Sequence, residues 1–88
     1  MNSNLQKYID KRLSKLNLYY SRIVNVDLYL KLDNQNDQIN KLVDLRIQIP
    51  GEDVVVGKKS ESFEKSLDMA ASTAERMLKR RKAKARIS

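Results

Sequence analysis

Apolar residues recur every three or four positions in the first part of the chain, which predicts an amphipathic helix. Its apolar stripe consists of Leu5, Tyr8, Ile9, Leu13 and Leu16. Ser3 or Asn2 can cap the start of this helix, and we expect it to end within residues 17–20. The cations of this segment fall away from the stripe and should form a solvent-exposed face: Lys7, Lys11, Arg12 and Lys15.

From residue 23 the apolar period changes to two, which predicts strands with one buried and one wet face. The first strand covers residues 23–32, with Tyr29 on its wet face. In the second strand the inward side chains are Val43, Leu45, Ile47 and Ile49. Residues 33–40 between them are polar and are expected to form a hairpin loop. They lack the glycine and the terminal glutamate of a calcium-binding hand.

A short turn and a third strand complete the predicted sheet. Pro50 presets one dihedral angle of the turn, and Gly51 permits a positive φ. The third strand covers residues 53–60, in which Gly57 marks a bulge or a close contact. We expect the three strands to form a single, antiparallel-rich sheet.

The chain closes on a second amphipathic helix, which Ser60 or Ser62 can cap. Its apolar face consists of Phe63, Leu67, Ala70, Ala71, Ala74 and Leu78. At about 1.5 Å per residue, residues 63–86 would span about 35 Å, whereas strands of about eight residues span about 27 Å. The helix should therefore project beyond the sheet. The predicted architecture is α-β-β-β-α, a single α+β domain over residues 1–88 with both helices on one face of the sheet.

Positive charge is concentrated at the two ends of the chain. The net charge is +7, and residues 79–86 contain six cations without an acid. The helix macrodipole accounts for about two or three cations in a last turn, but not for all of these. Such segregation favours an anionic partner, with nucleic acid as the preferred class. A solvated cationic face and an acidic membrane surface are the alternatives.

The residue types that the chain lacks exclude several kinds of chemistry. It has no cysteine and no histidine, so it cannot form disulfides or zinc–thiolate sites and lacks the usual general base. The remaining carboxylates, serines, lysines and tyrosines form no recognisable catalytic set, so we expect no enzyme, no metal site and no cofactor. No apolar run reaches the roughly 20 residues that span a bilayer, and the N-terminus does not have the pattern of a signal peptide. We expect a cytoplasmic protein.

Two segments carry a resemblance to a known family. In their order and spacing, "LQKYIDKRLSKLNLYYSRI" and "IPGEDVVVGKKSESFEKSLDMAASTAERMLKRRKAK" resemble the short ribosome hibernation-promoting factors, which include ribosome-associated inhibitor A and belong to the sigma-54 modulation protein family. The resemblance implies binding to rRNA in the channel of the small ribosomal subunit that otherwise holds mRNA and tRNA. It further implies repression of translation in starvation or stationary phase, with no chemistry, no small-molecule substrate and no membrane.

The resemblance also implies which cations contact rRNA. Those that match the family by position lie on the first helix and at the end of the second: Arg12, Lys15, Arg76, Arg80, Lys82 and Lys84. Lys79 and Arg81 are added because of their charge and their place between the matched cations. Together with these neighbours, residues 79–88 form the basic end of the last helix.

The sequence departs from the family in one respect that affects the fold. Family members begin with a strand before the first helix, whereas this sequence starts at the helix itself. By resemblance, that strand would pair beside the one that begins near residue 23, so we expect an exposed sheet edge. A weak homodimer through this edge is a possible consequence. The sequence also ends soon after the last helix, so the dimerisation domain of the family's long form is not expected.

Two other readings of the sequence stay open. The order α-β-β-β-α is also that of a double-stranded-RNA-binding domain. Such a domain carries its cations at the start of the second helix, which is the acidic segment "SESFEKSLD" in this chain. A protein–protein adaptor that uses the open edge and binds no RNA is the other reading. Tyr29 fits either cross-strand packing or stacking on a base.

Overall fold

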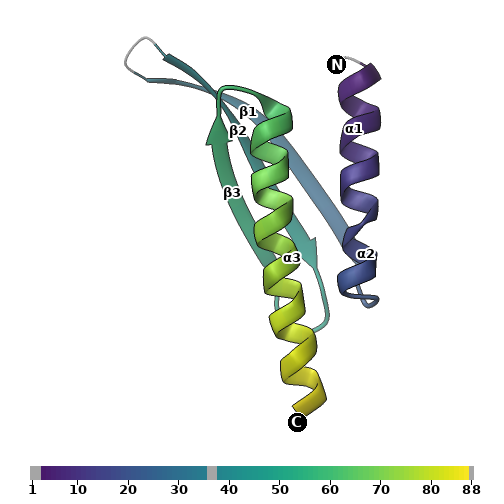
Figure 1. Ribbon diagram of the computed structural model, residues 1–88. Helices are drawn as coiled ribbons and strands as arrows, with labels where there is room; N and C mark the ends of the chain where they lie inside the picture. The colour runs from purple at the N-terminus through teal and green to yellow at the C-terminus, as the bar shows by residue number, and fades with distance from the viewer. Residues whose placement is uncertain (1–2, 36–37, 88) are drawn as a thin grey trace.

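The computed structural model describes residues 3–35 and 38–87 of the chain (Figure 1). Its elements are α1 (Ser3–Ser14), α2 (Leu16–Tyr19), β1 (Asn25–Gln35), β2 (Gln38–Gln48), β3 (Val54–Ser60) and α3 (Phe63–Ile87). The three strands form one antiparallel sheet in the order β1-β2-β3. Figure 1 shows α1 and α3 side by side on one face of this sheet. The predicted α+β architecture, with its helices on one face, is thus confirmed.

The first predicted helix is divided into α1 and a single turn, α2. The hydroxyl of Ser14 donates a hydrogen bond of 2.8 Å to the carbonyl of Lys11, and such back-bonding to the preceding turn often bends a helix. Helix α2 is capped at its C-terminal end by Tyr20. The backbone of Tyr20 is extended, and its N–H donates to the carbonyl of Leu16. The proposed caps Asn2 and Ser3 cannot be placed, because Asn2 and the side chain of Ser3 lie outside the described residues.

The predicted loop over residues 33–40 is wrong. The β1–β2 ladder runs from Asn25↔Gln48 through to Gln35↔Gln38, so only residues 36–37 separate the two strands, and these lie outside the described residues. The ladder uses backbone groups alone. A polar sequence can therefore extend the hairpin, and polar composition by itself does not indicate a loop.

The core lies between β2, β3 and α3. The inward row of β2 is fully covered, with Val43, Leu45 and Ile47 each at 0% exposure. On α3 the buried apolar residues are Leu67, Ala70, Ala71, Ala74 and Leu78, and the alanines allow a close approach of helix and sheet. Of the described polar side chains, that of Ser66 is buried with them, and its hydroxyl donates to the carbonyl of Lys41 over 2.6 Å. This bond ties the start of α3 to the central strand.

Turns and caps follow the sequence closely. Gly51 has a φ of 95°, as the predicted turn requires. Gly57 makes a close contact, because a Cβ at this position would lie 2.9 Å from an Asp44 carboxylate oxygen. The backbone N–H of Lys65 donates to the hydroxyl of Ser62 over 3.1 Å, which makes Ser62 the cap of α3.

Strand β1 lies at one edge of the sheet and is covered less well than β2. Within residues 3–35 and 38–87 its only strand partner is β2. Val24, just before β1, is 70% exposed, and Leu32 within it is 65% exposed. A groove of about 500 Å³ separates α1 from β1 and is lined by Gln6, Ile9, Asp10, Leu13, Leu28, Tyr29, Leu30 and Lys31. The described helices contain no stretch long and apolar enough to cross a bilayer.

Candidate nucleic-acid interface

The basic end of α3 extends past the sheet. Figure 1 shows the last turns of α3 beyond the ends of the strands, in a molecule whose longest dimension is 49 Å. Among the side chains that the structure describes, Leu78 is the last of α3 that belongs to the hydrophobic core. The cations on both sides of it whose side chains the structure describes are Arg76, Lys79, Arg80, Arg81 and Lys82. Lys84 lies in the helix, but its side chain lies outside the described part.

Two of these cations are held by the protein itself. The Lys79 ammonium lies 5.1 Å from the centre of the Tyr19 ring in α2, a cation–π contact. The guanidinium of Arg81 forms an ion pair of 3.1 Å with Glu52 in the turn between β2 and β3. These contacts fix α3 on two sides just before it leaves the sheet.

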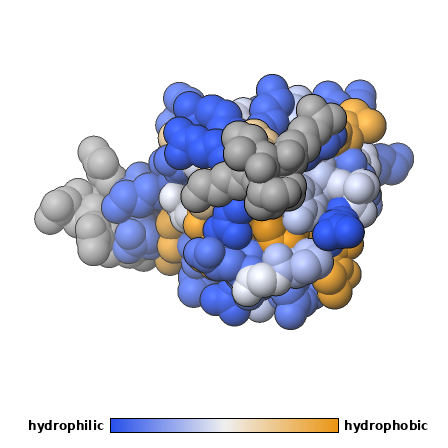
Figure 2. Space-filling view, turned by 90° about the horizontal axis from the view of Figure 1, so that it is seen from below, coloured by the Kyte–Doolittle hydropathy of each residue, from blue (hydrophilic) through white to orange (hydrophobic). Residues whose placement is uncertain are grey.

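The other cations of this region point their charge to solvent. Arg80 and Lys82 are exposed and form no ion pair with any described residue. Arg76 donates one hydrogen bond, 3.3 Å long, to the hydroxyl of Thr73 in its own helix. A guanidinium has five N–H donors, so most of those on Arg76 bond to no residue that the structure describes. Seen from below in Figure 2, the described surface is largely hydrophilic with smaller hydrophobic patches.

Arg12 does not lie on a solvent-exposed face, and that expectation is wrong. Its guanidinium bonds to Glu75 over 2.6 Å and to Asp68 over 3.2 Å, and it also donates to the hydroxyl of Ser72. Its side chain is only 18% exposed. Burial alone would lower the pKa of Arg12, but its bonds to Glu75 and Asp68 outweigh that and raise the pKa. Arg12 therefore clamps α1 onto α3.

Tyr8 joins the same cluster. Its hydroxyl lies 2.6 Å from both Asp68 oxygens and donates to this carboxylate. The bond to Asp68, together with burial, raises the pKa of Tyr8. Sequence reasoning placed Tyr8 in the apolar stripe and missed the cluster. The signal was present, since Tyr8 and Arg12 are four residues apart on α1 and their partners Asp68, Ser72 and Glu75 are three or four apart on α3.

The remaining predicted site residue, Lys15, is exposed at the junction of α1 and α2. The structure thus groups Arg76, Lys79, Arg80, Arg81 and Lys82 at one end of α3, whereas Arg12 contacts Asp68, Ser72 and Glu75 instead. Across the described residues, acidic side chains nowhere form a group of three or more that could hold a metal ion. What the arrangement can do chemically is bind anions along α3.

Comparison with known proteins decides the family. Residues 1–86 match the family model described as sigma 54 modulation protein / S30EA ribosomal protein. The chain belongs to this family. A ribosome hibernation promoting factor from Pseudomonas putida is 28% identical over 80 residues, which cover 91% of this chain and 74% of that protein. The resemblance recognised in the sequence is confirmed.

Solved structures share the fold of this S30EA-family chain. A ribosomal subunit interface protein from Coxiella burnetii superposes with a TM-score of 0.81 at 21% identity, over 93% of this chain and 86% of that one. The N-terminal domain of Protein Y from Thermus thermophilus superposes with a TM-score of 0.69 at 19% identity, over 90% and 83%. At such low identity these similarities establish the shared fold.

Proposed function

We propose that this protein is a ribosome hibernation factor that binds rRNA in the mRNA and tRNA channel of the small ribosomal subunit. Bound there, it represses translation in starvation or stationary phase. The single observation that carries the proposal is the exposed pair Arg80 and Lys82 at the projecting end of α3, outside the core and without ion pairs to the described residues. Membership in the family and the name of the Pseudomonas putida relative support the choice of partner.

The cations have two roles in this proposal: some contact rRNA phosphates, and others hold the helices in position. We assign contact with rRNA phosphates to Lys15, Arg76, Arg80, Lys82 and Lys84. Lys79 and Arg81 bind Tyr19 and Glu52, so they orient the helix and add positive potential close to the contact surface. Arg12 positions α1 against α3 through Glu75 and Asp68. Phosphate contacts of this kind bind without reading sequence, which suits a fixed rRNA surface selected by shape.

The proposed role needs no chemical step. Binding in the channel excludes mRNA and tRNA by occupancy, so the protein acts as a cytoplasmic, non-enzymatic regulator without a cofactor. A double-stranded-RNA-binding domain is the weaker candidate, because the first turn of α3 contains Glu64 and the preceding Glu61 pairs with Lys65 over 3.1 Å. The adaptor reading has support only from the open edge of β1.

That edge also supports a proposal on assembly. Strand β1 is 11 residues long, and edges of this length present unpaired backbone groups that favour pairing with another strand. We therefore propose weak self-association through β1 at high protein concentration. Leu28 and Leu30 line the groove beside this edge and would be covered by an added strand.

Cosedimentation with purified small subunits tests the proposed function. The protein should pellet with small subunits and inhibit translation in vitro, and saturating mRNA and tRNA should displace it. Exposed lysines that are already paired with acids should not contribute to small-subunit binding. A Lys59→Gln variant should therefore bind like the wild type. Binding to isolated RNA duplexes without any binding to small subunits would instead favour the double-stranded-RNA-binding domain.

A further inference from the structure

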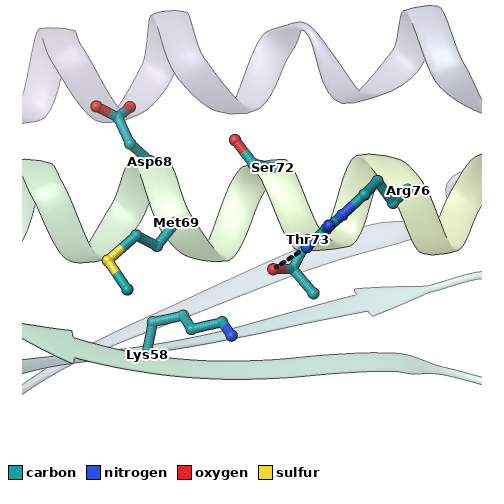
Figure 3. Close-up of a pocket in the computed structure, with 6 residues that line it drawn as sticks. All are labelled: Lys58, Asp68, Met69, Ser72, Thr73 and Arg76. Carbon is teal, nitrogen blue, oxygen red and sulfur yellow. Dashed lines mark hydrogen bonds between the residues drawn. The ribbon is translucent and has the colours of Figure 1, made fainter.

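A second cationic site lies beside the basic end of α3. A cleft of about 380 Å³ runs between α3 and the outer strand β3 (Figure 3). It is lined by Lys58, Asp68, Met69, Ser72, Thr73 and Arg76. Lys58 is not among the cations that the sequence points to, and it comes from the strand rather than from a helix.

Lys58 faces the helical layer and is not neutralised there. It pairs in register with Val43, whose side chain is buried under α3, so the two side chains share that face of the sheet. Lys58 forms no ion pair with any residue of 3–35 or 38–87. Its neighbour Lys59 lies on the opposite face and pairs with Asp33 over 3.8 Å. Two adjacent lysines thus have different environments.

Three donors converge in this cleft. Figure 3 shows the Arg76 guanidinium beside the Thr73 hydroxyl, with the Lys58 ammonium on the strand side of both. The single bond from Arg76 to Thr73 leaves the remaining guanidinium N–H groups available for an anion. Met69 is partly exposed and gives the cleft an apolar wall.

The one carboxylate in the lining is already engaged. Asp68 accepts hydrogen bonds from Arg12 and Tyr8, both on α1. Figure 3 shows the Asp68 side chain pointing toward the neighbouring helix, away from Lys58. The positive charge of Lys58 and Arg76 is therefore not cancelled within the cleft.

The cleft is also continuous with the exposed end of α3. Arg76 and Arg80 are four residues apart and lie on the same side of the helix, separated by about 6 Å along its axis. An anionic chain bound along Arg80 would reach Arg76 next and then Lys58. This order runs from the basic end of α3, which we call its tip, back toward the middle of the sheet.

We propose that the cleft binds a phosphate group of the RNA backbone. In this arrangement Lys58 and Arg76 neutralise the phosphate, the Thr73 hydroxyl donates to it, and an adjoining ribose lies against Met69. The inference rests on the proposed function and deepens it, because it makes β3 part of the RNA-binding surface. Lys58 then contacts the RNA strand where this strand continues from the basic end of α3 toward the sheet.

A matched pair of variants tests this inference. Lys58→Gln and Lys59→Gln remove the same charge from adjacent positions on opposite faces of β3. One lost phosphate contact lowers the slope of log affinity against log salt by about 0.8, which corresponds to about sixfold weaker binding at roughly 0.1 M salt. We expect this loss in small-subunit binding for K58Q, wild-type affinity for K59Q, and the same unfolding midpoint for both.

A third variant separates this inference from the proposed function. Arg80→Gln/Lys82→Gln removes cations at the tip and should weaken binding in any case. If it does so while K58Q and K59Q bind equally well, the cleft carries no RNA contact and the inference alone is overturned. If K58Q binds like the wild type but inorganic phosphate shifts the Thr73 amide resonance, the cleft takes free phosphate, which also overturns it. If the wild type does not bind small subunits, the proposed function itself fails.

Discussion

At the scale of single residues, the positive charges of this protein have two distinct uses. Arg12 is enclosed by acids of α3 and is only 18% exposed, whereas Arg80 and Lys82 are exposed. The first kind of charge stabilises helix packing and the second is available to a partner. Helical periodicity could predict that Arg12 lies off the apolar stripe. It could not predict where α3 would lie, and that position decides whether a residue off the stripe meets water or another helix.

The role of Arg12 leads to a prediction on stability. In an Arg12→Gln variant, Glu75, which is only 14% exposed, loses its counter-charge at an ion-pair distance of 2.6 Å. We expect the free energy of unfolding to fall by about 2 kcal/mol. Urea denaturation measures this change, with Lys11→Gln as the control from an exposed neighbouring position. Equal unfolding midpoints for the two variants would contradict the clamp.

Tyr8 predicts a dependence on alkaline pH. Its pKa is raised in the fold because the neutral hydroxyl donates to Asp68. The unfolded chain releases this proton at about pH 10, so the folded state binds more protons above that pH and loses stability as pH rises. The stabilisation is fully present below about pH 10 and disappears as pH passes the raised pKa of the folded state.

Thermal unfolding of the wild type and of Tyr8→Phe across this pH range measures the effect. The phenylalanine variant keeps the ring but has no proton to release. Its midpoint should therefore fall less steeply than that of the wild type above pH ~10. Parallel curves for the two proteins would show that the Tyr8–Asp68 bond makes no contribution.

At the scale of elements, the sequence predicted a helix or strand best where one of its faces is buried and the other is exposed to solvent. The inward row of β2 and the apolar face of α3 were predicted residue by residue, because burial on one side imposes a regular period. The length of the β1–β2 hairpin was not, since its outer part has polar residues that also suit a loop. The buried Ser66 bond to Lys41 was missed because nothing in the local pattern distinguishes it from a solvent-exposed serine.

The open edge of β1 leads to a prediction on strand addition. A synthetic peptide of alternating apolar and polar residues should pair with β1 and cover Leu28 and Leu30. Binding to the folded state alone stabilises it, by about 2.7 kcal/mol at a hundredfold excess over Kd. The thermal midpoint should therefore rise with peptide concentration.

A peptide of the same composition with its alternation scrambled is the control. Sedimentation analysis at increasing protein concentration should also show weak self-association, which the alternating peptide suppresses. A monomer at all concentrations, with a midpoint that neither peptide shifts, would mean that the edge is already well protected.

At the scale of the whole molecule, the outer face of the sheet, where two lysines are paired with acids, contrasts with the cationic tip of α3. On the face of the sheet away from the helices, Lys31 pairs with Asp44 and Lys59 pairs with Asp33. The tip of α3 extends past the ends of the strands (Figure 1). The candidate site could be predicted from sequence because charge density along the chain is visible without a fold. Lys58 could not, because its significance depends on the distance between β3 and α3.

The central claim is that the tip of α3 binds rRNA phosphates. Affinity for small subunits, measured at several salt concentrations, tests it most directly in three proteins. The first is the wild type, and the second is Arg80→Gln/Lys82→Gln/Lys84→Gln. The third is Lys31→Gln/Lys59→Gln/Lys65→Gln, which loses the same charge from lysines that are paired with acids.

Each phosphate contact contributes about 0.7–0.9 to the slope of log affinity against log salt. The tip variant loses three such contacts, so it should bind with a slope shallower by about 2.1–2.7 than the wild type, at an unchanged unfolding midpoint. The control variant should keep the wild-type slope to within about 0.5, because its lysines make no phosphate contact. Equal slopes in all three proteins would mean that the cations of the tip form only a solvated face, and the proposed mode of binding would be wrong.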